Sequence, residues 1–444
     1  MSRSGNKFEV IIAGGGIAGA AVALFLSHLN VHVTILESRP YRPAIHDGGI
    51  IMLGPNGMNV LQGLGLADKL LQRESGLQVS HITINDGDGQ LIGRVPQGSV
   101  ERHGFLSTVI LRWDIHEVLL DEVERKGLDM RWNSRVQSVD ESDSGVLVHW
   151  SEAAEMKEKK ADLLIGADGI WSMTRPSMYK CMGLEAPKPR YSGLVGIGCI
   201  LSIDAIPGLS KFLTLEDPVV MVHSRLGFVG MMRYDKDGKK IGWWTTHEAS
   251  ERSREEWNIP KEQLFRELHE RYSKSAFPIP QLVQTSEALD ERPLIVWPVY
   301  EVEKLGKWHS KRIVLIGDAA HAMPPHSGQG ASQALEDAAY LAYLIRQHLD
   351  QRSDSVQGSA GTELHSLLDT FQKERQPRVD EMIDEANRRG DRKRETSQIG
   401  MFIRKWILKI LILFMSQKWM DRWFAYKVPG IDEWAGLRSA ATQE

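Results

Sequence analysis

The stretch Val10-Ile11-Ile12-Ala13-Gly14-Gly15-Gly16-Ile17-Ala18-Gly19 decides the fold that this sequence predicts. It is an apolar run that leads into spaced glycines, and the small residues after it, Ala20 to Leu29, favour a helix. A second apolar run, Val31 to Leu36, ends at Glu37. The order strand, glycine turn, helix, strand and acid is typical of a dinucleotide-binding α/β unit. The alternative is a glycine turn from some other α/β protein, and the acid in register argues against it.

Each glycine of this turn has a physical reason to be a glycine. Gly14 permits a tight turn, Gly16 lets the backbone approach a pyrophosphate, and Gly19 lets the helix pack closely on the strand. The helix N-terminus directs N–H groups at the phosphates. Glu37 can accept a hydrogen bond from a ribose hydroxyl.

Composition restricts the remaining possibilities. The chain has 444 residues, 42% hydrophobic and 25% charged, which suits a globular protein of two or three domains. Its net charge of −4 gives no indication of a nucleic-acid partner. The two cysteines, Cys181 and Cys199, form neither a ligand cluster nor a disulfide framework, so no metal is expected. The first strand is expected by Phe8, which leaves no room for a signal peptide, and we predict a cytoplasmic protein.

Three further segments carry residues that suit a ligand-binding edge. Gly49 follows a loop that contains His46, and its lack of a side chain favours close approach to a ligand. The stretch Leu111-Arg112-Trp113-Asp114 is expected to open a helix that runs through Glu124, with Asp114 as a plausible cap. Asp168-Gly169 follows an apolar strand, and an acid at a strand end is a ligand position in open α/β sheets.

A second glycine loop follows a strand near the other end of the chain. The apolar run Arg312 to Ile316 ends at Gly317-Asp318, and Gly328-Gln329-Gly330 then opens a long helix, Ala331 to Leu349. This again directs a helix N-terminus at something negative or electron-rich. The polar stretch Gln351 to Thr362 is expected to be a loop.

These motifs stand in a fixed order: Gly14-x-Gly16-x-x-Gly19 with Glu37, then Asp168-Gly169, then Gly317-Asp318 leading to Pro325 and 328–330. Over roughly residues 7–390 the chain resembles the single-component FAD-dependent monooxygenases, the aromatic-hydroxylase group that includes salicylate and para-hydroxybenzoate hydroxylases. The resemblance implies FAD as cofactor, NADH or NADPH as electron donor, and O2 as co-substrate. No Cys or His stands in a context of flavin attachment, so the FAD is expected to be non-covalent.

The implied fold class is α/β, with a Rossmann-like FAD-binding domain of the glutathione-reductase type. A mostly antiparallel β-sheet substrate domain is interwoven with it, because the strands expected between Tyr191 and His247 alternate with tight turns. A C-terminal helical tail follows. The expected boundaries are 7–75, 103–185 and 293–395 for the FAD-binding domain, 76–102 and 186–292 for the substrate domain, and 396–444 for the tail.

The resemblance also implies a role for each site residue. Glu37 would hold the adenosine ribose, Asp318 the ribityl chain, and Asp168 with Gly169 both FAD and the nicotinamide donor. Gly49 would lie near the flavin, and Arg112 would contact the ribityl-phosphate region. Pro325 would sit over the ring. The amides of four residues would face the flavin pyrimidine edge and stabilise the anionic reduced flavin: Gly328, Gln329, Gly330 and Ala331.

Two positions depart from the family pattern. The family often has an Asn two residues after the last glycine, where this chain has Ser332. Many salicylate-hydroxylase relatives carry an arginine in the first strand of the sheet, in a Trp-Arg-Gly context. Here the stretch from Tyr191 to Cys199 contains no arginine, and a glycine stands where that arginine would be. This argues against an arginine-anchored carboxylate or phenolate substrate.

The predicted function is insertion of one oxygen atom from O2 into an electron-rich aromatic, heteroaromatic or alkene molecule through a flavin hydroperoxide. His326, beside Pro325, is the candidate base because histidine titrates in the useful range, although it could equally pack or face solvent. Two alternatives stay open. A flavin halogenase would need a Trp-x-Trp-x-Ile-Pro signature, but residue 255 is Glu. A non-oxygenating FAD-binding module is the other, and the intact Asp168, Asp318 and Pro325 argue against it.

The tail contains an apolar stretch, Ile399 to Met415, that carries three cations. It is shorter than the ~20 residues that span a bilayer. On a helical wheel Lys405 and Lys409 fall on one side, opposite Phe402, Trp406 and other apolar residues. Two interpretations remain: a helix that caps both domains, or peripheral membrane contact through 399–426, which would suit a lipophilic substrate.

Overall fold

The structure, a computed structural model, describes residues 7–42, 49–289, 294–354 and 360–434. Its centre is a five-stranded parallel sheet with the strand order β18-β12-β1-β2-β8. The apolar runs on either side of the first glycine turn are its middle strands, and both are largely buried, as a parallel sheet covered on two faces requires. The strands are β1 (Phe8–Ala13), β2 (Val31–Leu36), β8 (Asp129–Arg131), β12 (Leu163–Gly166) and β18 (Ile313–Leu315).

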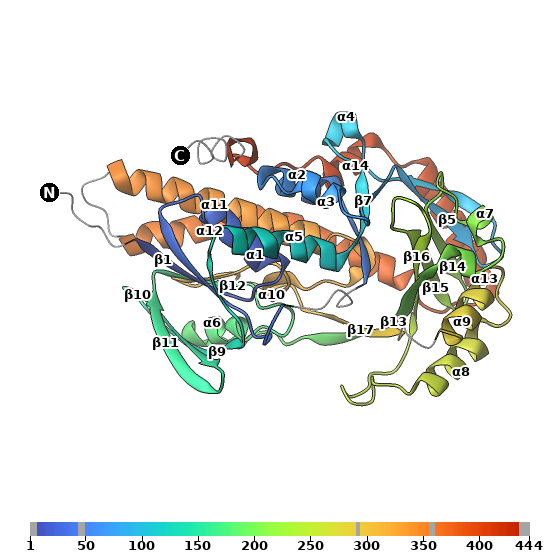
Figure 1. The fold of residues 1–444 in the computed structure, drawn as a ribbon, viewed down its shortest axis with the longest axis horizontal. Coiled ribbons are helices and arrows are strands. Elements are labelled where there is room, and N and C mark those ends of the chain that lie inside the picture. The colour runs from blue at the N-terminus through green and yellow to red at the C-terminus, as the bar shows by residue number, and fades with distance from the viewer. Residues whose placement is uncertain (1–6, 43–48, 290–293, 355–359, 435–444) are drawn as a thin grey trace.

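Helices cover one face of this sheet and a small antiparallel sheet covers the other (Figure 1). Helix α1 (Ile17–Leu26) packs against α5 (Arg112–Arg125) and α11 (Gly330–Asp354). The opposite layer contains β9 (Ser134–Ser142), β10 (Gly145–Glu152), β11 (Glu155–Ala161) and α6 (Thr174–Cys181). The fold is α/β, as the sequence predicts, and the helix N-termini lie at the carboxyl ends of the parallel strands.

A seven-stranded sheet stands beside this domain, with the order β17-β13-β16-β15-β14-β5-β6. Its neighbouring strands are antiparallel, except that β5 runs parallel to β14. Helices α8 (Lys261–Tyr272) and α9 (Ile279–Glu287) cover one face of it with an apolar core. Its strands are β5 (His81–Asp86), β6 (Leu91–Pro96), β13 (Arg190–Ser202), β14 (Val219–Ser224), β15 (Gly227–Arg233), β16 (Lys240–Glu248) and β17 (Ile295–Glu301).

A fourth sheet, three-stranded with the order β3-β7-β4, connects the two larger units. It is formed by β3 (Ile50–Leu53), β4 (Leu77–Val79) and β7 (Ser107–Leu111). The remaining short helices are α2 (Pro55–Gly63), α3 (Ala67–Leu71), α4 (Val100–His103), η1 (Ile203–Ala205) and α7 (Leu209–Phe212).

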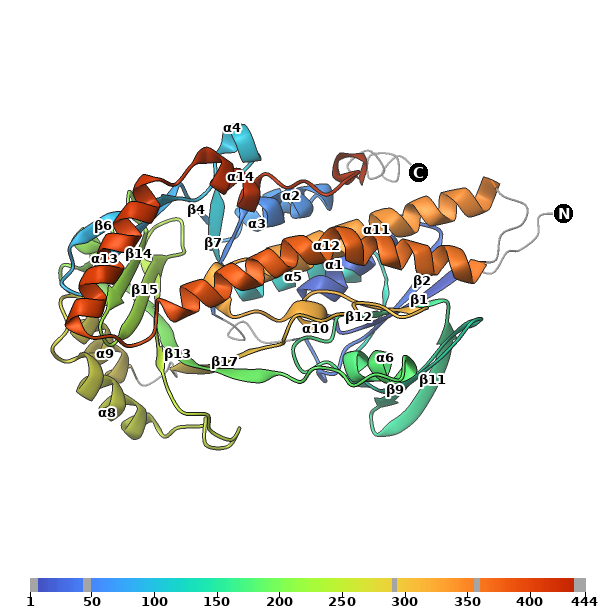
Figure 2. The same ribbon diagram turned by 180° about the vertical axis from the view of Figure 1, so that it is seen from behind.

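Long helices complete the chain on the side shown in Figure 2. Helix α12 (Ala360–Asp391) lies along α11, α13 (Gln398–Leu413) lies across the edge of the seven-stranded sheet, and α14 (Gln417–Phe424) returns toward α2. None of the helices in the described ranges is both long and apolar enough to cross a membrane.

Two local expectations are wrong. The stretch 351–362 is not a loop throughout, because α11 continues to Asp354 and α12 begins at Ala360; residues 355–359 lie outside the described ranges. Asp114 does not cap α5, which begins at Arg112 without a side-chain cap. Its carboxylate instead accepts a hydrogen bond from Ser75 Oγ, since position 114 already lies inside the helix.

Candidate active site at the edge of the parallel sheet

The first glycine turn closes through contacts that leave no space for side chains. Gly14 has φ +99°, and a Cβ there would lie 2.4 Å from the Ala167 carbonyl oxygen. A Cβ on Gly19 would lie 1.9 Å from the Gly14 carbonyl oxygen. A Cβ on Gly16, which caps α1, would meet no atom within 4 Å. The turn is therefore tight where it contacts protein and open where the helix N-terminus would receive a phosphate.

Two side chains hold this turn from neighbouring elements. Glu37, at the end of β2, accepts hydrogen bonds from the backbone N–H of Gly15 at 2.8 Å and of Arg39 at 2.9 Å. His116 of α5 donates from Nε2 to the Gly15 carbonyl at 2.7 Å. Burial lowers the pKa of His116, so the ring is neutral and suited to this single donation. His116 escaped sequence reasoning because its partner lies 101 residues away.

Gly49 and Arg112 lie together at the start of β3 and α5. The Arg112 backbone N–H donates to the Gly49 carbonyl at 3.0 Å, and a Cβ on Gly49 would meet no atom within 4 Å. The Arg112 side chain is exposed. His46, considered in the sequence as a loop histidine, lies outside the described residues.

Asp168 organises the loop that follows β12. Its carboxylate accepts hydrogen bonds from Ser172 Oγ at 2.5 Å and from the backbone N–H groups of Met173 and Thr174, both at 2.9 Å. Arg175 fastens the same loop to the second glycine loop by donating to the Ala319 carbonyl at 2.9 Å. Gly169 adopts φ +79°. Asp168 therefore has a structural task at the strand end, beside any contact with a ligand.

The second glycine loop presents both exposed and buried residues. Asp318 opens α10 (Asp318–His321), is exposed, and has no side-chain partner among the described residues. Pro325 is exposed in the turn η2 (Pro325–Ser327), whereas His326 is buried. Hypothetical Cβ atoms on Gly328 and Gly330 would meet nothing within 4 Å, so the N-terminus of α11 is open. Gln329 is buried, and its Oε1 accepts from Asn56 Nδ2 at 3.0 Å.

A buried ionic network holds this loop in place. Asp337 accepts hydrogen bonds from the Gly317 backbone N–H at 3.0 Å and from His321 Nε2 at 2.5 Å. Arg375 of α12, which is fully buried, contacts both Asp337 at 2.9 Å and Glu336 at 2.5 Å. Burial alone would raise the pKa of both carboxyl groups, but Arg375 and the other neighbouring cations hold these pKa values below their usual range.

The parallel sheet brings the predicted cofactor residues to one edge. Four successive strands of the sheet each end shortly before one of these residues: β2 before Glu37, β1 before Gly14, β12 before Asp168 and β18 before Asp318. Two open helix N-termini, a carboxylate without a protein partner, and glycines with free space beside them match a large anionic dinucleotide. The residues present fit FAD.

The face of the seven-stranded sheet that points away from α8 and α9 carries glycines beside large apolar side chains. Gly196 and Gly230 lie on that face, and two indole rings occupy the space where their side chains would be: Trp297 lies 2.0 Å from a Cβ built on Gly196, and Trp244 lies 2.3 Å from one built on Gly230. Ile50 of β3 similarly fills the space beside Gly242. The glycines therefore let aromatic rings lie flat on the sheet.

Three further side chains in and near β14 and β15 have different surroundings. His223 pairs with Phe228 across β14 and β15, on the face that carries Trp244. Tyr234 packs in the cluster that contains Met232, and Arg225 lies in the turn between the two strands. His326 contacts a residue that the sequence did not single out, Lys393, with Nδ1 3.3 Å from Nζ.

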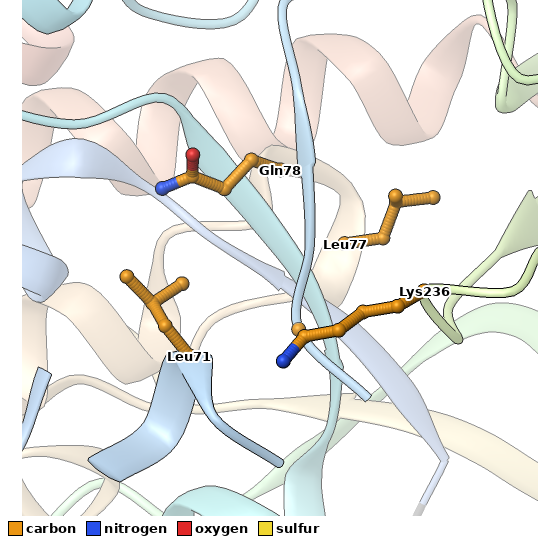
Figure 3. Close-up of a pocket in the computed structure, with 5 residues that line it drawn as sticks. Leu71, Leu77, Gln78 and Lys236 are labelled. Carbon is orange, nitrogen blue, oxygen red and sulfur yellow. The ribbon is translucent and has the colours of Figure 1, made fainter. Parts of the chain in front are cut away.

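Two open pockets lie elsewhere on the molecule. One, of about 410 Å³, is lined by residues that include Leu71, Leu77 and Lys236 (Figure 3). The other, of about 600 Å³, lies beside α8 and includes His247 and Arg271. Neither is lined by a residue predicted to bind cofactor, so neither corresponds to the candidate site.

The fold and this edge together define a flavin-dependent oxidoreductase. Residues 7–386 match the family described as FAD binding domain, and the chain belongs to that family. It is 30% identical over 356 residues to the FAD-dependent monooxygenase paxM of Penicillium paxilli, covering 77% of this chain and 70% of that protein. It is 29% identical to 6-hydroxynicotinate 3-monooxygenase of Bordetella bronchiseptica, covering 77% and 84%.

Solved structures agree with the fold. A salicylate hydroxylase substrate complex superposes with a TM-score of 0.73 at 22% identity, covering 97% of this chain and 98% of that one. The sequence expectation of an FAD-dependent monooxygenase is therefore confirmed, with FAD as its cofactor.

Proposed function

We propose that this monooxygenase takes electrons from NADH or NADPH and inserts one oxygen atom of O2 into an electron-rich aromatic, heteroaromatic or alkene molecule. The observation that carries the proposal is the aromatic face of the seven-stranded sheet, where the rings of Trp244 and Trp297 lie against Gly230 and Gly196. Flat apolar surfaces suit planar or unsaturated substrates.

The residues of the chain divide the work of binding. The pyrophosphate binds at the α1 N-terminus, beside Gly14, Gly16 and Gly19. Glu37 binds the ribose, and Asp318 binds the ribityl chain. The open N-terminus of α11 at Gly328, Gln329, Gly330 and Ala331 stabilises negative charge on the reduced ring. When bound, FAD supplies the oxygen-transfer chemistry by the route that the sequence resemblance implies. Pro325 and the two indoles exclude water from the reacting face.

Asp168 is proposed to act in the reaction with the nicotinamide donor, together with Gly169, in addition to holding its own loop. The donor is expected to bind transiently, because the sequence contains no second dinucleotide fingerprint. Gly49 and Arg112 are proposed to border the flavin and its phosphates.

The test begins with the purified protein. It should be yellow, should release its colour on acid precipitation if FAD is non-covalent, and should oxidise NAD(P)H faster in the presence of a true substrate. Phenols, heteroaromatics and polyenes are screened for accelerated oxidation with a product that gains one oxygen atom. A yellow protein that does not oxidise NAD(P)H, whichever compound is added, would favour the non-oxygenating module.

We also propose that α13 contacts a membrane surface. One side of α13 attaches it to the protein through both polar and apolar contacts. Lys405 Nζ lies 2.6 Å from Asp86 and 3.0 Å from Gln90 Oε1, Arg404 donates to the Arg394 carbonyl at 3.0 Å, and Leu408 is buried in the apolar cluster of the sheet edge. The opposite side of α13 faces outward, with nine apolar side chains 44–77% exposed: Ile399, Phe402, Ile403, Trp406, Ile407, Ile410, Leu411, Leu413 and Phe414.

Helix α14, which follows α13, packs inward, so the proposed contact is placed on α13. Trp423 and Phe424 of α14 are buried against Met382, and Arg378 donates to the Trp423 carbonyl at 3.2 Å. The described α13 contains no acidic residue, and Lys409 lies beside Trp406. An apolar face with an aromatic residue and flanking cations fits an anionic lipid surface, from which an apolar substrate could be taken.

Liposome co-sedimentation tests this contact. The full protein should sediment with vesicles that contain phosphatidylserine, and Phe402→Glu/Trp406→Glu should remain in the supernatant while still binding FAD. Met156→Glu, which alters an exposed apolar residue on β11, is the matched control and should sediment like the parent. A parent protein that never sediments with anionic vesicles would eliminate the membrane contact.

A further inference from the structure

Lys393 is a buried lysine beside the proposed reacting face. It lies just beyond the end of α12 and is 8% exposed. Its Nζ is 3.3 Å from His326 Nδ1 and 4.0 Å from the centre of the Phe228 ring. Phe228 lies on the face of the sheet that carries Trp244, and His326 follows Pro325. The amine therefore sits where the flavin loop meets the substrate sheet.

Lys393 has no counter-ion among the described residues, in contrast to Arg375 and Arg389. Arg375 contacts two carboxylates and Arg389 contacts Glu385 at 2.9 Å. In the described part of the chain no carboxylate lies within ion-pair distance of Lys393, and the charged group that most affects it is another cation, Arg389. An isolated buried ammonium is costly, and a ligand anion would remove that cost.

The imidazoles around Lys393 are also incompletely bonded. His326 Nε2 and His223 Nδ1 are buried without a hydrogen-bond partner. The His326 ring is held against α12 because residue 390 is glycine; a Cβ there would lie 2.7 Å from the ring. Such an arrangement of fixed donors with no protein acceptor is a built site for an acceptor from outside.

We propose that Lys393, positioned by His326, binds the negatively charged oxygen of an acidic aromatic substrate, a phenolate or a carboxylate. This inference rests on the proposed function and deepens it. It also provides the cation that is absent from the first strand of the sheet, because Lys393 reaches the same face from the end of α12. His326 then acts as a positioning residue rather than as the base expected from the sequence.

The electrostatics of the site are consistent with this assignment. Burial, followed by Arg389, lowers the pKa of Lys393 to about 7. Burial, followed by Lys393, Arg394 and Arg389, lowers the pKa of His326 well below its usual range, so the ring is a weak base. His223, Arg404 and Arg392 are further titratable or charged groups beside this cluster. An anion bound to Lys393 would raise the pKa of the lysine and keep it charged at neutral pH.

Binding to the FAD-loaded protein, without NAD(P)H, tests the proposal separately from the oxygenation reaction. The probes are 4-nitrophenol, whose absorption spectrum reports whether it is bound as the phenolate, salicylate as a carboxylate, and the neutral 4-nitroanisole. We expect binding of at least one anionic probe, with 4-nitroanisole bound roughly ten- to a hundredfold more weakly. Preference for 4-nitrophenol over salicylate would identify a phenolate site, and the reverse a carboxylate site.

Lys393→Met should lose that preference and bind the anion and 4-nitroanisole alike, while retaining FAD. Lys373→Met, the same change at an exposed position of α12, should bind the probes as the parent does. His326→Gln, which keeps a hydrogen-bonding side chain, should weaken anion binding less than Lys393→Met. The proposal is overturned if the parent binds no anionic probe, or if Lys393→Met keeps the preference. A failure of this kind would leave the oxygenation assay unaffected.

Discussion

The two glycine turns at the edge of the parallel sheet do similar work but are stabilised differently. The first is closed by tight backbone packing and by residues of β2 and α5. Gly19 packs on the Gly14 carbonyl, the Gly14 N–H donates to the Leu36 carbonyl at 2.8 Å, and Glu37 and His116 form hydrogen bonds with Gly15. The second depends on a helix far along the chain, because the acid that accepts from the Gly317 N–H is in turn bound by Arg375.

This difference separates what a short sequence motif can hold from what tertiary structure must hold. The first turn is determined by residue size at three positions, and size is visible in the sequence. The second is determined by a buried ion pair, in which each partner alone would be strongly destabilising. A variant that enlarges a tightly packed glycine should therefore damage the first turn, and a variant that removes a buried charge should damage the second.

The largest effect is expected from Gly19→Ala. Its Cβ would lie 1.9 Å from the Gly14 carbonyl oxygen, a distance that requires the helix or the turn to move. We expect a protein that does not retain FAD and unfolds at a much lower temperature. Gly16→Ala is the matched change, because its Cβ meets no protein atom: its apoprotein should melt like the parent apoprotein, with only FAD affinity reduced. Thermal unfolding and FAD titration measure both, and equal behaviour of the two variants would contradict the steric account.

Arg375→Met should have the next largest effect. It leaves Glu336 and Asp337 buried without their shared cation, which costs about 3–5 kcal/mol of unfolding free energy in comparable buried pairs. Denaturant unfolding of the apoprotein measures this loss. Arg388→Met, which removes a half-exposed arginine paired with Glu385 on the same helix, should change stability by less than about 1 kcal/mol. Similar losses for both variants would show that the network does not hold the second turn.

The fold could be predicted because its determinants are local patterns. Apolar runs followed by glycines at Gly14–Gly19 and Gly317–Gly330 give strands with helix N-termini at their carboxyl ends, and the structure has both. The parallel pairing of β5 with β14 could not be predicted, since Thr83 and Val220 are joined only in three dimensions. Element boundaries also differ, as with α11, because helix ends depend on packing.

The site was less predictable where it depends on distant elements. Glu37, Asp168 and Asp318 follow strands, so their common edge follows from the parallel sheet. Arg375 and Lys393 gave no sequence signal, because Arg375 lies in α12 and Lys393 just after its end, in a stretch whose many charges look like a solvated face. The orientation of α13 was equally hidden: a helical wheel separates its two sides but does not say which side faces the protein.

A smaller effect is expected from Asp318→Ala. Asp318 is exposed and unpartnered among the described residues, so its loss should not alter the fold. Removing the acceptor for a ribityl hydroxyl should weaken FAD binding by about 1–3 kcal/mol. Asp88→Ala, an exposed acid in the β5–β6 connection, serves as the control and should bind FAD as the parent does. Unchanged FAD affinity in Asp318→Ala would remove this residue from the cofactor site.

The smallest effect is expected in the pH dependence of the unfolding free energy, through His116 beside the first turn. Because burial lowers the pKa of His116 in the folded state, the unfolded chain binds a proton below about pH 6.5 while the folded protein does not. Stability is therefore lost as the pH falls below that value, by at most about 1.4 kcal/mol for each pH unit. His116→Gln keeps a donor for the Gly15 carbonyl but does not titrate, so its unfolding free energy should fall less steeply between pH 6.5 and 5. His309→Gln, another buried histidine with a lowered pKa, should flatten the same curve but leave the pH dependence of FAD binding unchanged. If His116→Gln also leaves the pH dependence of FAD binding unchanged, the histidine supports the fold without affecting cofactor binding at the turn.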